Sequence, residues 1–227
     1  MAYETIADVI ADPQFAKADL ELRRGKHISA SPDIFLYDFI ATAQPYLERF
    51  YEAYNVRLVC GSEGYFYLLP DKNHVPPPLG NRHLSAVDML VGQTLALMRL
   101  DPKWLADNGR IPESSIIELM EHILGQERLL GYIERRRGKD TAVDARKLRE
   151  VVRSSLAELK RLGFIHREGQ GETAVAVPYI SIMRFADPVR GSESLGDALT
   201  RLLREGEIEE IADKPSNFLD ADSLDNA

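Results

Sequence analysis

Basic side chains are concentrated in one stretch of this sequence, and phosphate binding is the chemistry that they could perform. Residues 128–167 hold twelve Lys and Arg against five Asp and Glu, a net charge of +7. The whole chain of 227 residues has a formal net charge of -8, so the remainder carries -15. Because Lys and Arg attract phosphate groups electrostatically, this distribution favours a nucleic-acid surface on one part of an otherwise acidic protein.

Four of these basic residues fall on one face of a helix that the sequence predicts over residues 143–162. At about 100° per residue they lie within an arc of about 60°, and the apolar residues centre about 120° away. Further candidates precede the helix in a loop or follow it on a hairpin. The candidate DNA-binding residues are Arg135, Arg136, Arg137, Lys139, Arg146, Arg149, Arg153, Lys160 and Arg167. A helix face that is merely solvated is the alternative interpretation.

Patterns for catalysis and metal binding are absent, so no enzyme, cofactor or metal is expected. Cys60 is the single cysteine, which excludes an internal disulfide and a zinc cluster built on cysteines. The chain has neither a Gly-Lys-Ser/Thr phosphate loop nor a Gly-x-Ser-x-Gly nucleophile elbow. Residues 169–174 imitate a dinucleotide-binding fingerprint, but they lie between two predicted strands and so indicate a hairpin turn. The five histidines are isolated from one another: His27, His74, His83, His122 and His166.

The elements that must position the basic residues follow a pattern that occurs twice, with helices leading into a two-stranded hairpin. Predicted helices cover residues 3–25 in two short pieces, 32–54 with a potential break at Pro45, 86–100 after an N-cap at Ser85, 114–124 and 143–162. Predicted hairpins cover residues 55–70 and 164–178. The expected fold class is α+β, mainly α, with tandem winged-helix domains that each carry a small β-hairpin wing.

The expected domain organisation has three parts. An N-terminal winged-helix domain covers residues 1–108, a C-terminal winged-helix domain covers 109–204, and an acidic tail covers 205–227. The tail holds eight acidic residues and one basic residue, a composition typical of disordered segments. The N-terminus lacks the features of a signal peptide, and no apolar run approaches the ~18 residues of a membrane span. We therefore expect a cytoplasmic protein without a membrane partner.

One set of aromatic residues occurs around the first predicted hairpin. Its helical and strand spacing favours a core between helix and hairpin over base stacking, with any exposed edge suited to a protein partner. The set is Phe50, Tyr51, Tyr54, Tyr65, Phe66 and Tyr67.

Several ordered motifs of the chain resemble the MukE family, the accessory subunits of bacterial MukBEF condensins. In the first half they are LRRGKHI at 22–28, FLYDF at 35–39, YLERFYEAYNVRL at 46–58 and EGYFYL at 63–68. Further along they are DMLVG at 88–92, LADNG at 105–109, VRSSLAELKRLG at 152–163 and the pair Arg184 and Phe185. The resemblance covers about residues 15–208.

The resemblance implies a fold, partners and a role. It implies tandem winged-helix domains, a homodimer and no catalytic activity, in a nucleoid-associated protein. The implied partners are a MukF-like kleisin subunit, a MukB-like SMC-type ATPase reached through the complex, and double-stranded DNA. The implied role is chromosome condensation and segregation. The alternatives are a related MksE protein, the equivalent subunit of a Wadjet-type plasmid-defence complex, and a winged-helix transcription regulator.

Overall fold

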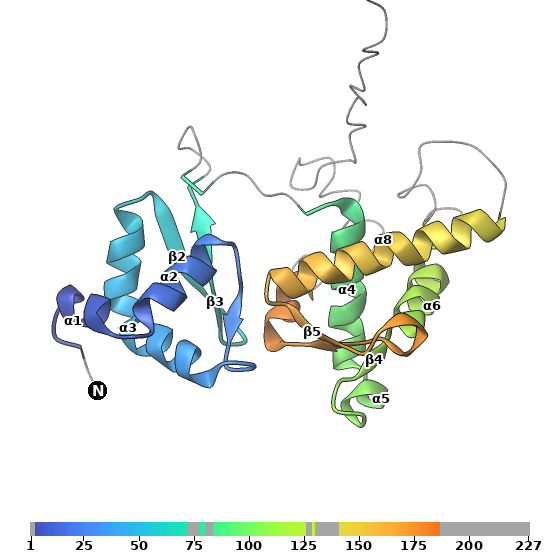
Figure 1. Ribbon diagram of the computed structural model, residues 1–227, viewed down its shortest axis with the longest axis horizontal. Helices are drawn as coiled ribbons and strands as arrows, with labels where there is room; N and C mark the ends of the chain where they lie inside the picture. The colour runs from blue at the N-terminus through green and yellow to red at the C-terminus, as the bar shows by residue number, and fades with distance from the viewer. Residues whose placement is uncertain (1–2, 72–77, 80–83, 126–128, 130–140, 187–227) are drawn as a thin grey trace, which may run out of the picture.

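The computed structural model describes residues 3–71, 78–79, 84–125, 129 and 141–186. These residues form a mainly helical α+β protein with small antiparallel sheets, as the sequence predicted. Two halves lie side by side: the first half is blue to cyan in Figure 1, and the second is green to orange.

The first half begins with two short helices. A capping box starts the first of them, and a proline follows its end. Its elements are α1 (Ile6–Ala11), α2 (Phe15–Arg23), β1 (Ile28–Ser29), α3 (Ile34–Glu52), β2 (Val56–Gly61) and β3 (Tyr65–Pro70). Thr5 and Asp8 form a capping box at the start of α1, and Asp12 ends that helix before Pro13, as expected. At the start of α3 the Asp33 side chain accepts a hydrogen bond from the Leu36 amide at 3.1 Å.

The expected hairpin of the first half is confirmed, and α3 packs on its sheet. Strand β3 lies between β1 and β2, and Gly64 turns the hairpin with a φ of +80°. Helix α3 continues through Pro45 without a break. Residues on both sides of this proline, such as Ile40 and Leu47, are buried in one core, so packing compensates for the lost hydrogen bond.

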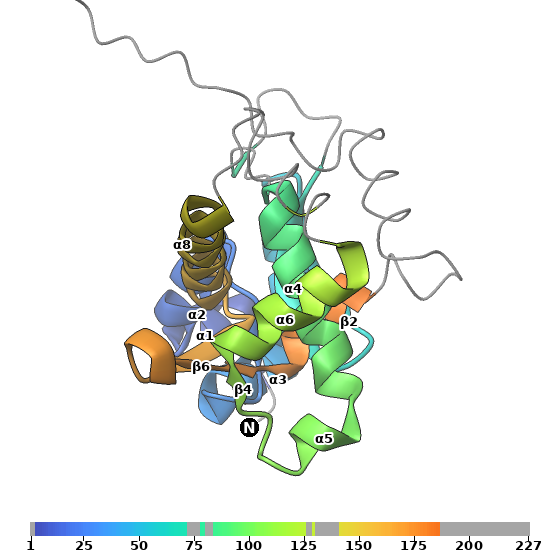
Figure 2. The same cartoon turned by 90° about the vertical axis from the view of Figure 1, so that its right-hand side faces the viewer.

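The second half is built around one apolar helix. Its elements are α4 (Ala86–Leu100), α5 (Pro102–Leu105), β4 (Ile111–Pro112), α6 (Glu113–Leu124), α8 (Thr141–Arg161), β5 (Ile165–Glu168), η1 (Gly171–Thr173), β6 (Val175–Pro178) and η2 (Ile180–Ala186). The predicted N-cap Ser85 forms a capping box with Asp88. Helix α4 contacts α6, α8 and η2, and Figure 2 shows α6 crossing it. Leu90, Val91 and Leu95 of α4 are fully buried.

Both halves share one strand order. In the first half β1 pairs with β3 and β3 pairs with β2; in the second half β4 pairs with β6 and β6 pairs with β5. All four pairings are antiparallel. In each half a long helix, α3 or α8, directly precedes the hairpin. The glycines at 169 and 171 lie between β5 and β6, as predicted for a turn.

The hydrophobic clusters divide the chain before α4. One cluster takes residues of α1 to β3, with Leu79 packed against it, and the other takes α4 onward, with Leu84 packed against it. The domain boundary at residue 108 stays a prediction from the sequence, and it would assign α4 to the first domain. The apolar face of α4 packs on α6 and α8 in the second cluster. The acidic tail at 205–227 lies outside the described residues.

Candidate nucleic-acid interface

Helix α8 carries the predicted basic stripe on a face that points away from its buried side. Leu148, Val152 and Leu159 are each at most 1% exposed and pack in the second cluster. The helix packs against α4 and runs along the upper edge of the second half in Figure 1. Arg146, Arg149, Arg153 and Lys160 are all exposed, as a basic stripe requires. The structure therefore brings these four predicted residues together on one surface.

Three residues of this stripe are available to an anionic ligand. Arg146 has 83% of its side chain exposed, although its Nε lies 3.1 Å from Glu150 Oε1. An exposed pair of this kind is worth little energy, so a phosphate can displace it. Arg149 and Lys160 have no ion-pair partner among the described side chains. We call Arg146, Arg149 and Lys160 the open basic face.

Arg153 and Arg167 are held by one nearly buried carboxylate. Glu113 is 7% exposed, and its two carboxylate oxygens accept from Arg167 Nε at 2.6 Å and from Arg153 Nε at 3.4 Å. Arg153 also donates to the Gly171 carbonyl at 3.4 Å. Glu113 opens α6, and its amide donates to the Ala174 carbonyl at 3.1 Å. These contacts fasten α6, α8 and the hairpin to one another, so both arginines have a structural role.

The remaining four predicted DNA-binding residues cannot be placed. Arg135, Arg136, Arg137 and Lys139 lie outside the described residues.

A second notable site lies where the two halves meet, around His27. Its backbone amide donates to the Leu162 carbonyl at 2.7 Å. Its ring is buried, with its centroid 4.2 Å from that of Phe164 and 5.0 Å from that of Tyr67. The guanidinium of Arg184 contacts Nε2 and also lies 4.0 Å above the Tyr67 ring. We call His27, Tyr67, Phe164 and Arg184 the junction cluster.

The junction cluster requires a neutral imidazole. A guanidinium group can only donate, so Nε2 of His27 must accept from Arg184, and the ring proton belongs on Nδ1, 3.3 Å from the Leu162 carbonyl oxygen. Burial and, after it, the charge of Arg184 hold the pKa of His27 well below its usual value. In the sequence His27 is one of five histidines that lie far from one another. Its partners Leu162, Phe164 and Arg184 lie more than a hundred positions away, a separation that no spacing rule detects.

Other chemistry finds no support in the described part of the chain. No three His, Cys, Asp or Glu side chains there are grouped so as to hold a metal ion. None of the helices described is long and apolar enough to span a bilayer. Of the aromatic set, Tyr51, Tyr65 and Phe66 are at most 2% exposed. Tyr51 and Phe66 belong to the predicted core between helix and hairpin. The Tyr65 ring lies instead near His27, with its centroid 6.2 Å from that of the imidazole, and Tyr54 is 47% exposed.

Comparison with known proteins gives one consistent family. The sequence matches the MukE-like family over residues 2–227. A relative in Histophilus somni is 36% identical over 202 residues, which cover 89% of this chain and 80% of that protein. One in Escherichia coli K12 is 35% identical, with 89% and 84% covered. One in Yersinia pseudotuberculosis is 32% identical, with 97% and 92% covered. All three are named chromosome partition protein MukE.

Removing the carboxylate that holds both arginines should destabilise the second half. We expect Glu113→Gln to lower the free energy of unfolding by about 1–3 kcal/mol, because two charge-assisted hydrogen bonds are lost or weakened. Urea denaturation followed by circular dichroism measures the change. Glu118→Gln is the matched control, since Glu118 is an exposed residue of the same helix. Equal stability of the two variants would show that Glu113 does not fasten these elements.

The junction cluster should make stability depend on pH. His27 has a lowered pKa in the folded state, so unfolding takes up a proton as the pH falls through the usual histidine pKa of about 6.5. The wild-type protein should therefore lose stability from about pH 7.5 to about pH 5.5, by at most about 1.4 kcal/mol per pH unit.

Urea titrations across this pH range test the expectation. His27→Gln should flatten the profile, whereas His122→Gln, on the exposed side of α6, should leave it unchanged. Parallel profiles for wild type and His27→Gln would contradict it.

Proposed function

Because the chain belongs to the MukE-like family, we propose that it is a non-enzymatic accessory subunit of a MukBEF-like condensin that acts in chromosome condensation and segregation. The observation that carries the proposal is the extent of the match, which spans residues 2–227 and 80–92% of the relatives described above. Their shared name, chromosome partition protein, favours a chromosomal role over plasmid defence. ATP hydrolysis in such a complex belongs to the SMC-type partner.

Each half is proposed to be a winged-helix domain. The support is the shared strand order, in which the first strand pairs with the third and the third with the second, and the long helix before each hairpin. On this assignment α8 is the helix that approaches nucleic acid and β5 with β6 forms the wing. The proposed domain boundary lies between residues 79 and 84, and its support is the separation of the two hydrophobic clusters, with Leu79 packed against one and Leu84 against the other.

Protein partners are proposed to bind exposed apolar side chains. A MukF-like kleisin and a second copy of the chain are the partners that the family suggests. Phe35 at the start of α3 is 74% exposed, and Leu100 and Leu105 near the end of α4 and in α5 are each 59% exposed. Large apolar groups at the surface are typical of sites that bind other proteins.

We propose that DNA of the nucleoid binds to the open basic face. Contacts between Lys or Arg and phosphates do not read the base sequence. With a net charge of -8 the chain as a whole repels DNA, so binding by the isolated subunit should be weak and sequence-independent. Arg135, Arg136, Arg137 and Lys139, which precede α8 in the sequence, stay in the proposal as predicted DNA-binding residues. Arg153 and Arg167 would add to the local potential while they remain bound to Glu113.

Assembly tests the first part of the proposal. The purified chain, mixed with the kleisin-like and SMC-like proteins of the same organism, should co-elute with them in size-exclusion chromatography. Light scattering of the chain alone should give twice the monomer mass of 25.6 kDa. ATPase activity should be absent from the chain alone and present in the SMC-like protein. Failure to co-elute with the kleisin-like protein would refute the proposed role.

DNA binding tests the second part. In Arg149→Glu with Lys160→Glu, affinity for a fluorescent duplex should fall and the dependence of log affinity on log salt should become shallower by about 1 per lost phosphate contact. Fluorescence anisotropy of the assembled complex over a salt series measures both quantities. The control is Lys103→Glu in α5, remote from α8 in the sequence and away from it in Figure 2.

The outcomes separate the alternatives. An unchanged affinity and salt dependence would remove DNA binding by this face from the proposal. Selection of bound fragments from random DNA should recover no motif, whereas a recovered motif would favour a transcription regulator.

A further inference from the structure

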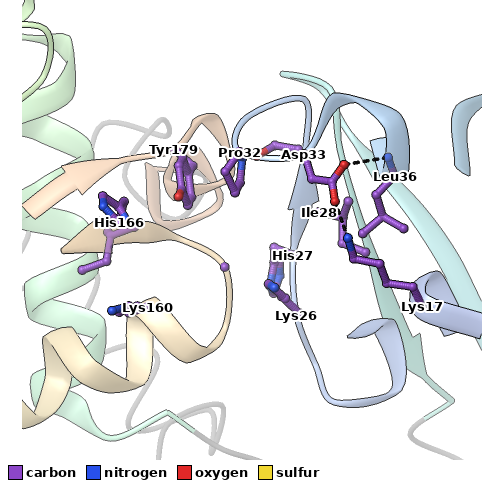
Figure 3. Close-up of a pocket in the computed structure, with 13 residues that line it drawn as sticks. Lys17, Lys26, His27, Ile28, Pro32, Asp33, Leu36, Lys160, His166 and Tyr179 are labelled. Atoms are coloured by element: carbon purple, nitrogen blue, oxygen red, sulfur yellow. Dashed lines mark hydrogen bonds and ion pairs between the residues drawn. The ribbon is translucent and has the colours of Figure 1, made fainter. Parts of the chain in front are cut away.

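A cleft of about 250 Å³ lies between the two halves, next to the junction cluster. Figure 3 shows its two walls facing each other: Lys160, His166 and Tyr179 belong to the second half, and Lys26 and Pro32 belong to the first. Lys17 of α2 also lines it. The cleft is thus formed by residues that only the contact between the halves brings together.

The charges that line the cleft favour an anion. The lining holds Lys17, Lys26 and Lys160 against Asp33, a formal charge of +2 with His166 counted as neutral, and counting Glu21 just outside the lining leaves +1. Lys17 Nζ lies 2.5 Å from Asp33 Oδ2. Lys26 Nζ lies 2.7 Å from Oε2 of Glu21, a residue outside the lining. A concave site with an excess of positive charge and apolar walls focuses the field, which strengthens its attraction for anions.

The spacing of the two walls is fixed before any ligand binds. The backbone amide of His27 donates to the Leu162 carbonyl at 2.7 Å, directly beside the cleft. Gly163 lies against the His27 carbonyl, so closely that a Cβ there would come within 2.4 Å of its oxygen. Arg161 adds a hydrogen bond to the Arg24 carbonyl at 3.4 Å. A preformed site avoids the cost of ordering its walls when the ligand arrives.

The cleft continues the open basic face. Lys160 belongs to both, and Arg149 lies eleven positions earlier on the same helix, about 16 Å away along its axis. A ligand that reaches both must carry negative charge over that length. Duplex DNA does so, with about one phosphate charge per 1.7 Å of its axis. An unrelated acidic peptide lacks this regular, rigid row of charges.

We propose that the interdomain cleft is a phosphate-binding site for the DNA backbone, so that a bound duplex lies across both halves. One phosphate sits between Lys26 and Lys160, and Lys17 and Lys26 exchange part of their contacts with Asp33 and Glu21 for the ligand. This inference rests on the proposed DNA-binding function, and it adds a contact from the first half that the basic segment of the sequence does not contain.

Charge removal on the first half tests the proposal separately. Lys17→Gln combined with Lys26→Gln in the full chain should weaken duplex binding several-fold at low salt. The salt dependence should become shallower by about 1 to 2. Lys26→Gln and Lys103→Gln in α5 each remove one positive charge. Lys26→Gln should bind the duplex more weakly than Lys103→Gln and should show the shallower salt dependence. Circular dichroism and urea midpoints check that each variant is folded.

A footprint on the unaltered protein avoids any effect of substitution on folding. Reductive methylation should modify Lys17, Lys26 and Lys160 more slowly when duplex DNA is bound, and Lys103 at the same rate. Polyglutamate of equal charge should protect them less well. Equal or better protection by polyglutamate would assign the cleft to an acidic protein segment and overturn the proposal.

The results also separate this inference from the proposed function. If Arg149→Glu with Lys160→Glu weakens binding while the first-half variants do not, the cleft site is refuted and the open basic face stands. If neither pair changes binding, both are refuted. The proposal stands if both pairs lower the affinity and the salt dependence.

Discussion

The arrangement of this molecule depends on the close approach of two backbones at Gly163. This residue ends α8 with a φ of +76°, a conformation that favours glycine. A side chain would collide with the His27 carbonyl. The Gly163 carbonyl in turn accepts from Ser181 Oγ at 2.7 Å. The end of the basic helix, the start of the hairpin and the neighbouring half are therefore fixed at one point, and the junction cluster closes around it.

Local acidic partners decide which basic residues remain available to a ligand. Arg153 and Arg149 lie on the same face of α8, yet only Arg153 reaches Glu113. A nearly buried carboxylate needs charged partners, so Glu113 engages Arg153 of the stripe together with Arg167 of β5. In the junction cluster, by contrast, the partner of the arginine is not an acid. Arg184 contacts the neutral imidazole of His27 and lies over the aromatic ring of Tyr67. Charge counts along the sequence do not distinguish these cases.

An acidic protein with a confined basic surface suits a subunit that acts inside a larger complex. The net charge of -8 opposes binding to DNA from most directions. The basic helix and the cleft offer the proposed exception on one side, and their geometry relies on contact between the halves. Exposed apolar groups such as Phe35 provide separate surfaces for proteins. The proposed role therefore requires no catalysis by this chain. It requires only that the surfaces for DNA and for proteins are correctly placed.

Short-range physics explains why the sequence predicted the elements so well. The N-cap at Ser85, the turn at Gly64 and the periodicity of α8 act within a few residues, and the structure confirms each of them. Long-range packing decided the rest. It kept α3 continuous through Pro45, placed α4 in the second cluster and gave His27 partners from the other half. The stripe on α8 was readable because one helix carries it, whereas the cleft was not, because its walls come from segments more than a hundred residues apart.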